Sequence, residues 1–217
     1  MIDFKINGKP YKIPQSFDEM QFKDYCRCFQ GLADTDGKEG YDLFRTVKEN
    51  EAAVLSRVMG ENDAFAMDLP LDVFATLTDA VHFVYDIDSV GDKSSIDIDG
   101  KTYVVPKPNE FSLRQWIDAD VTMQDKDNPS QYIELLGILL VEVGEDGKTK
   151  PYTGEWQKMT ARLERLSCSE ALPLVMHFFR RGAILSKLTH FSSKIKEVET
   201  QLRQAIRNSL SNTTGSI

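Results

Sequence analysis

Three cysteines and three histidines carry the side chains that could act as nucleophiles, redox groups or metal ligands. Cys26 and Cys28 are two residues apart on an expected helix, so they point to different sides of it, and no further ligands lie near them in the sequence. With Cys168 they make an odd number in a chain that opens without a secretory signal, which favours reduced thiols in a cytosol. We therefore interpret the cysteines as small core residues.

The histidines are His82, His177 and His190, and none has the spacing of a zinc motif. His177 lies in the apolar run 174–179 and is expected to pack or to form a hydrogen bond in the core. A Ser/His/Asp or Cys/His site stays open, because such partners meet only in space. No Gly-x-Ser-x-Gly motif and no glycine-rich phosphate loop supports it. We expect no enzyme, no cofactor and no metal.

Segment 95–100 reads Ser-Ile-Asp-Ile-Asp-Gly and places oxygen ligands at alternate positions before a glycine, which is half of a calcium-loop pattern. The twelfth position of such a loop needs a glutamate, and here it falls on Pro106. A turn at Asp99-Gly100 explains the same residues, so we interpret the segment as part of a hairpin.

The net charge of −8 conceals an asymmetry along the chain. Residues 157–217 carry ten Lys or Arg and four Asp or Glu, whereas the rest of the chain carries 16 and 30. Such a chain could dock on itself, stack head to tail or meet an acidic partner. Nucleic-acid binding would need like charges on one face, which Lys196, Arg203 and Arg207 could share. Because two glutamates interrupt that field, protein partners are favoured over nucleic acid.

The C-terminal segment has the clearest helical pattern in the chain, with apolar residues at spacings of three and four. This apolar stripe consists of Leu185, Leu188, Phe191, Ile195, Val198, Leu202, Ile206 and Leu210. Burial against the protein's own helices and self-association are both open. The candidate partner-binding residues are Ile195, Val198, Leu202, Ile206, Arg203 and Arg207.

The elements that would position these residues come in two copies. Residues 4–14 and 96–106 are similar at an offset of 92, and residues 22–25 recur as 113–116 after a one-residue deletion. The recurring positions of the first block are Ile6, Gly8, Lys9, Tyr11 and Pro14, matched by Ile98, Gly100, Lys101, Tyr103 and Pro106. Each block has Asn-Gly or Asp-Gly between alternating residues, which predicts a β-hairpin. Two hairpin-plus-helix units suggest a duplicated scaffold rather than a catalytic pocket.

The expected fold is α+β and mainly helical, with helices packed around one small antiparallel sheet formed by both hairpins. Strands are expected at 3–6, 9–13 and the equivalent places of the second copy, and helices at about 16–32, 41–59, from 70, 113–119, 131–143, 153–166 and 169–181. The expected helix signals are a capping box at Ser16 and Glu19, an N-cap at Ser112 and a C-cap at Gly60. We divide the chain into residues 1–90, residues 91–182, and residues 183–217 as a basic amphipathic C-terminal helix with a frayed tail.

The composition, with 41% hydrophobic and 28% charged residues, is that of an ordinary globular protein. The apolar stretch 133–143 is too short to span a bilayer, and the N-terminus has no apolar signal-peptide core. We therefore expect neither a membrane protein nor an exported one.

The repeated unit Ile-[Asn/Asp]-Gly-Lys-x-Tyr-x-[Ile/Val]-Pro, followed by 20–25 or 111–118, resembles small proteins of tailed bacteriophages. Further segments that fit the resemblance are 54–60, 69–74, 133–140, Tyr152, Arg162 and 177–182. It implies a tail assembly chaperone or a minor structural protein of the neck, tail or baseplate, and it implies no catalytic residue.

We expect a non-enzymatic virion morphogenesis protein, and favour a minor structural component of the tail, neck or baseplate. It would lie in the virion, and in the host cytoplasm during assembly, with other virion or assembly proteins as partners; a homo-oligomer is left open. The alternatives are a cytosolic tail assembly chaperone and a nucleic-acid-binding accessory protein acting through the basic C-terminal segment.

Overall fold

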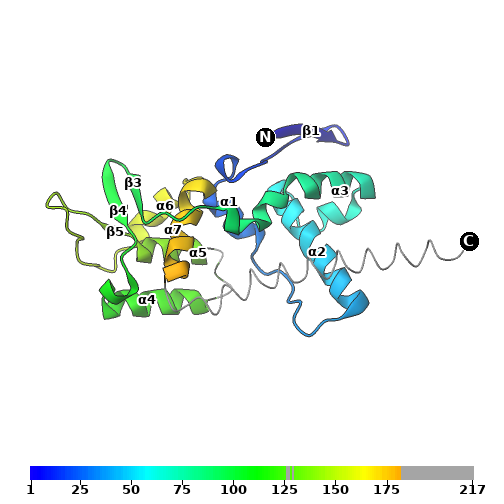
Figure 1. The fold of residues 1–217 in the computed structure, drawn as a ribbon. Helices are drawn as coiled ribbons and strands as arrows, with labels where there is room; N and C mark the ends of the chain where they lie inside the picture. Colours follow the sequence, from blue (N-terminus) through cyan, green and yellow to red (C-terminus); the bar gives the residue numbers. More distant parts are fainter. Residues whose placement is uncertain (126–127, 129, 182–217) are drawn as a thin grey trace, which may run out of the picture.

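The computed structural model describes residues 1–125, 128 and 130–181 (Figure 1). Its strands are β1 (Ile2–Ile6), β2 (Lys9–Ile13), β3 (Ser95–Ile98), β4 (Lys101–Val104) and β5 (Val141–Glu142). Its α-helices are α1 (Phe22–Cys28), α2 (Gly40–Val58), α3 (Leu71–Ala80), α4 (Leu113–Gln124), α5 (Gln131–Leu139), α6 (Gln157–Leu163) and α7 (Cys168–Arg181). Short 3₁₀ turns are η1 (Phe17–Glu19), η2 (Phe65–Asp68), η3 (His82–Tyr85), η4 (Ile87–Ser89) and η5 (Pro108–Glu110). The predicted mainly helical α+β class is confirmed; the predicted C-terminal helix, residues 183–217, lies outside the described residues.

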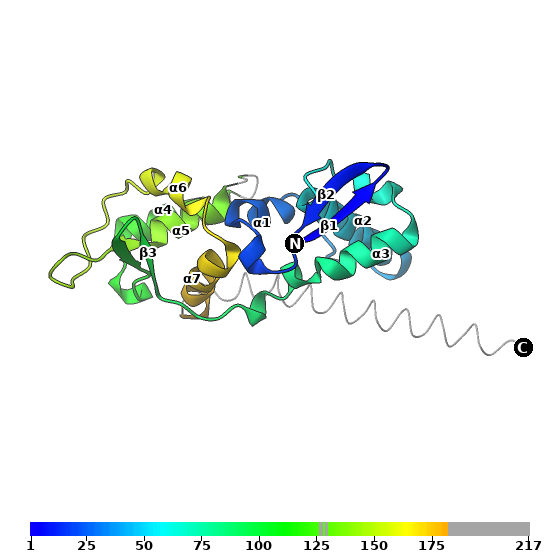
Figure 2. The same ribbon diagram turned by 90° about the horizontal axis from the view of Figure 1, so that it is seen from above.

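The described chain is elongated, with one hairpin at each end (Figures 1 and 2). The first hairpin packs with α2 and α3 around a small core that contains Tyr11, Ile13 and Leu55. The larger core joins the second hairpin to α5, α6 and α7, and it also contains Phe22 and Cys26 of α1. Helix α1, which belongs to the first copy, therefore packs between the two ends. The division of the chain at residues 90 and 182 stays a prediction.

Both hairpins have the predicted turn. The φ angles are +50° and +83° at Asn7 and Gly8, and +51° and +76° at Asp99 and Gly100, and a type I′ turn needs positive φ at both positions. The register is also shared, because Ile6 faces Lys9 in the first hairpin and Ile98 faces Lys101 in the second. The two sequence blocks thus adopt the same backbone shape.

The prediction that both hairpins join one sheet is wrong. β1 and β2 form a two-stranded sheet, whereas β3, β4 and β5 form a separate three-stranded one. In the second sheet the outward carbonyl of Thr102 accepts a hydrogen bond from Val143 of the β5 segment (2.8 Å). The first copy has Pro10 at this position, which keeps the carbonyl acceptor but has no N–H to donate to a neighbouring strand. Each hairpin instead packs against the helices of its own end.

The repeat extends beyond the sequence blocks that revealed it. The Glu19 carboxylate accepts a hydrogen bond from the Gln15 N–H (2.9 Å), and the Glu110 carboxylate accepts one from the Lys107 N–H (3.0 Å). Both glutamates end a 3₁₀ turn, and an α-helix starts three residues later in each copy.

The second helix of each copy belongs to the repeat as well. Lys9 pairs with Glu61, and Lys101 pairs with Glu142 at 3.1 Å. Each glutamate lies three residues after the end of the helix that follows, α2 in the first copy and α5 in the second. The duplicated unit is therefore hairpin, 3₁₀ turn, helix, helix, and a glutamate that returns to the hairpin lysine.

The predicted continuous helix at 16–32 is wrong. The chain forms η1, becomes extended at Met20 and Gln21, and then starts α1. The extended pair is held by the segment before α7: the Phe22 N–H donates to Leu166 O (2.8 Å) and the Cys168 N–H donates to Met20 O (2.9 Å). Ser16 therefore makes no side-chain cap, and the predicted capping box is absent from the structure.

The other helices follow the predictions more closely. Helix α2 covers the predicted range and is followed by Gly60 at a φ of +74°. The Ser112 hydroxyl caps α4 by accepting a hydrogen bond from the Gln115 N–H (3.1 Å), although the helix runs further than predicted, to Gln124. Helix α5 is buried as predicted but ends at Leu139, because the next residues form β5. Within the described ranges, no helix combines the length and the apolarity that crossing a bilayer requires.

Candidate interaction surfaces

The structure places none of the predicted partner-binding residues. Ile195, Val198, Leu202, Arg203, Ile206 and Arg207 all lie outside the described residues.

The cysteines are free and buried, as predicted. Burial raises the pKa of the Cys28 thiol to about 12, and it raises the pKa values of Cys26 and Cys168 above the ordinary thiol value as well. The thiols consequently stay protonated at neutral pH, and a protonated thiol is a poor nucleophile and metal ligand. No group of three or more His, Cys, Asp or Glu that could hold a metal ion occurs in the part of the chain that the structure describes.

His177 is a packed and hydrogen-bonded residue, as predicted. Its side chain is buried on α7, and its Nδ1 atom pairs with the Asp92 carboxylate. The residue after Asp92, Lys93, donates a hydrogen bond from its N–H to Pro173 O in α7 (3.4 Å). These contacts attach the connection between the two copies to α7. His190 lies outside the described residues.

The carboxylates of the calcium-like segment have protein partners. The Thr102 hydroxyl donates to Asp97 across the hairpin (2.6 Å), and Asp99 pairs with Arg162 of α6 (2.9 Å). These contacts agree with the hairpin interpretation of the segment.

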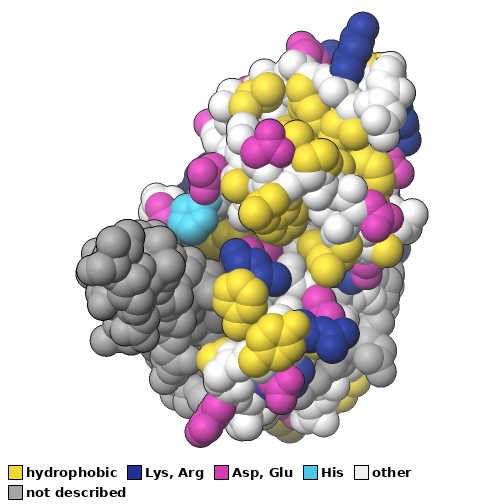
Figure 3. Space-filling view, turned by 90° about the vertical axis from the view of Figure 1, so that its right-hand side faces the viewer, with side chains coloured by type: hydrophobic (Ala, Val, Ile, Leu, Met, Phe, Trp, Pro, Cys, Tyr) yellow, Lys and Arg dark blue, Asp and Glu magenta, His cyan; other side chains and the backbone are white. Residues whose placement is uncertain are grey.

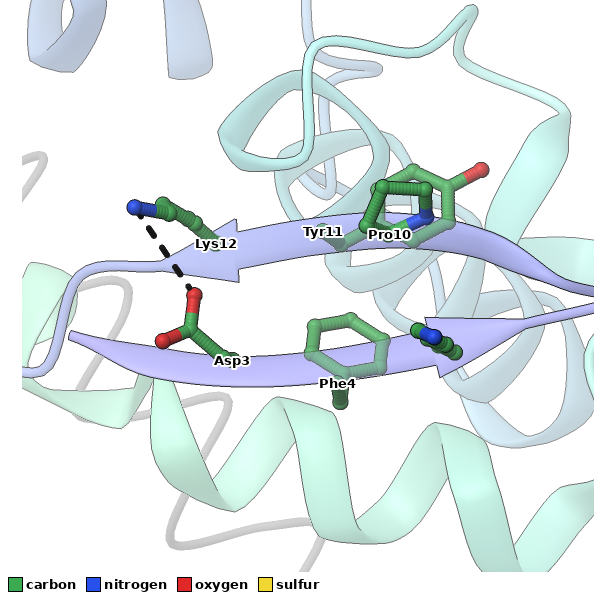
Figure 4. Close-up of a pocket in the computed structure, with 6 residues that line it drawn as sticks. Asp3, Phe4, Pro10, Tyr11 and Lys12 are labelled. Atoms are coloured by element: carbon green, nitrogen blue, oxygen red, sulfur yellow. Dashed lines mark ion pairs between the residues drawn. The ribbon is translucent and has the colours of Figure 1, made fainter.

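A hollow of about 290 Å³ lies on the first hairpin (Figure 4). Asp3 and Lys12 face each other across the strands at 4.0 Å, and both side chains are largely exposed. The Phe4 and Tyr11 rings stack at 5.5 Å, and the Tyr11 hydroxyl donates to Glu61 (2.9 Å). An exposed ion pair contributes little binding energy, and the tyrosine is committed to holding the hairpin on α2. The hollow therefore lacks the converging polar groups of a ligand site.

Three strand edges pair with no other described strand. They are the edges of β1 and β2 in the first sheet and the edge of β3 in the second. The β2 edge lacks one outward donor, because Pro10 has no N–H. The outer side of β5 is taken by the 149–150 segment, where the Lys150 N–H donates to Glu142 O (2.8 Å). An unpaired edge offers N–H and C=O groups to an added strand.

Helix α4 exposes an apolar face, which we call the α4 face and define as Leu113, Ile117 and Val121. Their exposed fractions are 77%, 54% and 62%. The residues are four apart, so they share one side of the helix over about 12 Å. The opposite side is buried against α5, where Gln115 donates to Ile138 O (2.8 Å).

The corresponding face of α1 is covered. Phe22 and Cys26, the counterparts of Leu113 and Ile117, are 1% and 5% exposed. They are covered because α7 and the residues before it pack on α1. The two copies thus differ in what covers their first helix.

A third apolar surface lies at the end formed by α2 and α3. Figure 3 shows hydrophobic side chains gathered there among charged ones. Its most exposed members are Tyr41, Phe44, Met67 and Leu71. Exposed apolar groups of this kind mark contact surfaces when they cluster.

No protein-family model, no curated protein and no solved structure was found that matches this chain. The sequence predicted two hairpin edges available for strand addition, whereas the apolar surfaces were not singled out from it. The spacing of Leu113, Ile117 and Val121 was a readable signal for a shared face, but an apolar face of a helix is buried in most folds. Only the arrangement of α5 and α7 shows that this one is open.

Proposed function

We propose that the protein is a non-enzymatic component of a bacteriophage virion that acts through protein–protein surfaces in the tail, neck or baseplate. The observation that carries the proposal is the duplicated hairpin–helix–helix unit, each copy of which has a strand edge without a strand partner. The sequence of this same unit resembles small morphogenesis proteins of tailed phages. A duplicated unit with two equivalent edges is suited to contacting repeated or related subunits in an assembly.

The exposed apolar surfaces support the same proposal. The α4 face lies at one end of the molecule, and the surface around Tyr41 and Leu71 lies at the other. Apolar residues that cluster on a surface favour burial against another protein, because removing apolar area from water is favourable. Contacts at both ends suit a protein that bridges neighbours in a particle.

The location of the protein tests this proposal directly. Mass spectrometry of purified virions should detect the chain as a particle component. Its presence in lysates of infected cells together with its absence from virions would favour a tail assembly chaperone and overturn the structural role.

Substitutions on the β1 edge test the mode of contact. In a two-residue hairpin Lys5 and Pro10 form a pair without ladder bonds, so the Lys5 N–H points outward from the edge. Lys5→Pro removes this donor, and Pro10 shows that the ribbon accepts proline opposite it. We expect Lys5→Pro to reduce incorporation into virions about tenfold, which is the loss of about 1.4 kcal/mol.

The matched control is Lys5→Ala, which removes the side chain but keeps the N–H. It should leave incorporation within about twofold of the unchanged protein, a few tenths of a kcal/mol. Equal effects of the two substitutions would assign the contact to the lysine side chain, and no effect of either would exclude strand addition at β1.

A further inference from the structure

The backbone that precedes α4 has the shape that receives an extended segment in the first copy. Gln21 has φ −74° and ψ 144°, and Ser112 has φ −69° and ψ 154°. In the first copy, the extended residue Gln21 forms an antiparallel bridge with Ser167, which precedes α7. Before α4 the same shape is present next to the exposed α4 face. The second copy therefore has an open site whose equivalent in the first copy is filled by a helix and its leading residues.

We propose that residues 185–195 of this chain cover the α4 face as an amphipathic helix. The described chain ends near α4. The Phe178 ring, near the end of α7, stacks on Phe111 at 5.7 Å, and Phe111 contacts Trp116 of α4 at 5.4 Å. On the helix Trp116 is 60° from Leu113, at the border of the exposed face. The chain thus leaves α7 close to the start of α4.

The lengths of the connecting residues and of the segment also fit the α4 face. Residues 182–184 can span about 10 Å when extended, which is enough to pass from the end of α7 to a neighbouring helix. The α4 face is about 12 Å long, and a helix from Leu185 to Ile195 is about 15 Å long. The apolar residues Leu188, Phe191 and Ile195 recur at spacings of three and four, as the residues of a covering helix must.

The charges of the segment and of α4 are complementary at this place. Asp120 lies beside the α4 face, three residues after Ile117 on the same helix, and its carboxylate accepts a hydrogen bond from Gln124 (2.7 Å). Segment 185–195 carries Lys187 and Lys194 and no acidic residue. A basic segment that is tethered next to an acidic, apolar face binds it at a high effective concentration. The part of the stripe beyond Ile195 then stays available for a partner, and this assignment holds whether or not the protein is a virion component.

Limited proteolysis of the full chain tests the proposal. Trypsin cuts after Lys187 and Lys194, and a docked helix protects both sites. Ile117→Glu places a charge on the α4 face without disturbing the core, since Ile117 is exposed. We expect cleavage after Lys187 to become about tenfold faster, which corresponds to about 1.4 kcal/mol. Leu188→Glu, which changes the segment and not the folded body, should give the same increase at Lys194.

The matched control is Leu71→Glu, the same kind of change at an exposed position of α3, which should leave the cleavage rate unchanged. Equal rates for the unchanged protein and for Ile117→Glu and Leu188→Glu would overturn the proposal.

Cross-linking distinguishes the chain's own segment from that of a second copy. The double variant Ile117→Cys with Phe191→Cys should form a disulfide within one chain under mild oxidation, because the native thiols are buried and protonated. A disulfide that joins two chains, with protection that falls on dilution, would assign the face to a second copy and overturn the proposal. Absence of any disulfide in a folded variant would also count against it.

Discussion

Arg57 offers the most direct test of how the first copy is held together. From α2 its Nη1 atom donates to the carbonyls of Arg27 and Cys28 (3.2 Å each) and also to that of Gln30, at the end of α1. Its Nε and Nη2 atoms donate to the Asp63 carboxylate at 2.7 and 2.6 Å. One guanidinium therefore satisfies carbonyls that a helix of seven residues cannot satisfy itself, and it is positioned by a carboxylate.

The magnitude follows from these bonds. A hydrogen bond to a charged group contributes about 1.5–3 kcal/mol, and bonds that share one donor group do not add in full. We expect Arg57→Ala to lower the free energy of unfolding by about 2–3 kcal/mol. In a protein of this size 1 kcal/mol shifts the Tm by about 2–4 °C, so the Tm should fall by about 4–12 °C. Arg57→Lys keeps the charge but not the planar guanidinium with its several N–H donors. It should recover less than half of the lost free energy of unfolding.

Thermal and urea unfolding measure the loss, and hydrogen exchange of α1 locates it. Arg45→Ala is the matched control, because Arg45 lies on the same helix in an exposed pair with Glu49 (2.8 Å) and should cost below about 0.5 kcal/mol. The reasoning is refuted if Arg57→Ala costs no more than Arg45→Ala, or if exchange in α1 is unchanged.

The same clamp predicts a pH dependence. Hydrogen bonds from Arg57 hold the pKa of the Asp63 carboxyl below its usual value. A lowered folded pKa adds stability above the unfolded pKa of about 4, and this stability is lost as the pH falls through the folded pKa. Asp63→Asn should therefore flatten the acid limb of the stability profile below about pH 4.

Two further predictions compare buried and exposed positions. Phe22→Ala should cost about 3–5 kcal/mol in urea unfolding, whereas Leu113→Ala, at the equivalent place of the second copy, should cost below about 0.5 kcal/mol; similar costs would contradict the open α4 face. The thiols of Cys26, Cys28 and Cys168 should react with iodoacetamide at pH 8 at least about a hundredfold more slowly in the folded protein than in urea, and rapid native alkylation at any of them would show that it is not buried.

The hairpins could be predicted from the sequence because their determinants are local. A turn with positive φ at two positions is met by Asn7-Gly8 and Asp99-Gly100 and by few other dipeptides. The pairing of the sheets could not be predicted in this way. It depends on which strand reaches the edge of β4, and that strand comes from residues about forty positions later.

The predicted helix boundaries were wrong where a segment distant in the sequence forms hydrogen bonds with the backbone. Residues 16–32 have a helical pattern, yet Met20 and Gln21 are extended because the chain before α7 pairs with them. The exposed apolar surfaces could not be predicted for a related reason. Whether an apolar helix face is core or surface depends on its neighbours, so the similar faces of α1 and α4 have opposite exposure.

The difference between the two edges of each sheet has a consequence for stoichiometry. A sheet that can be extended on both sides can grow without limit, as fibrils do. Here Pro10 removes one outward donor from β2, and the 149–150 segment takes the outer side of β5. The edges of β1 and β3 are therefore better suited to accept a strand than the opposite edges. Under the proposed function, one molecule would contact two added strands at these edges, one in each copy.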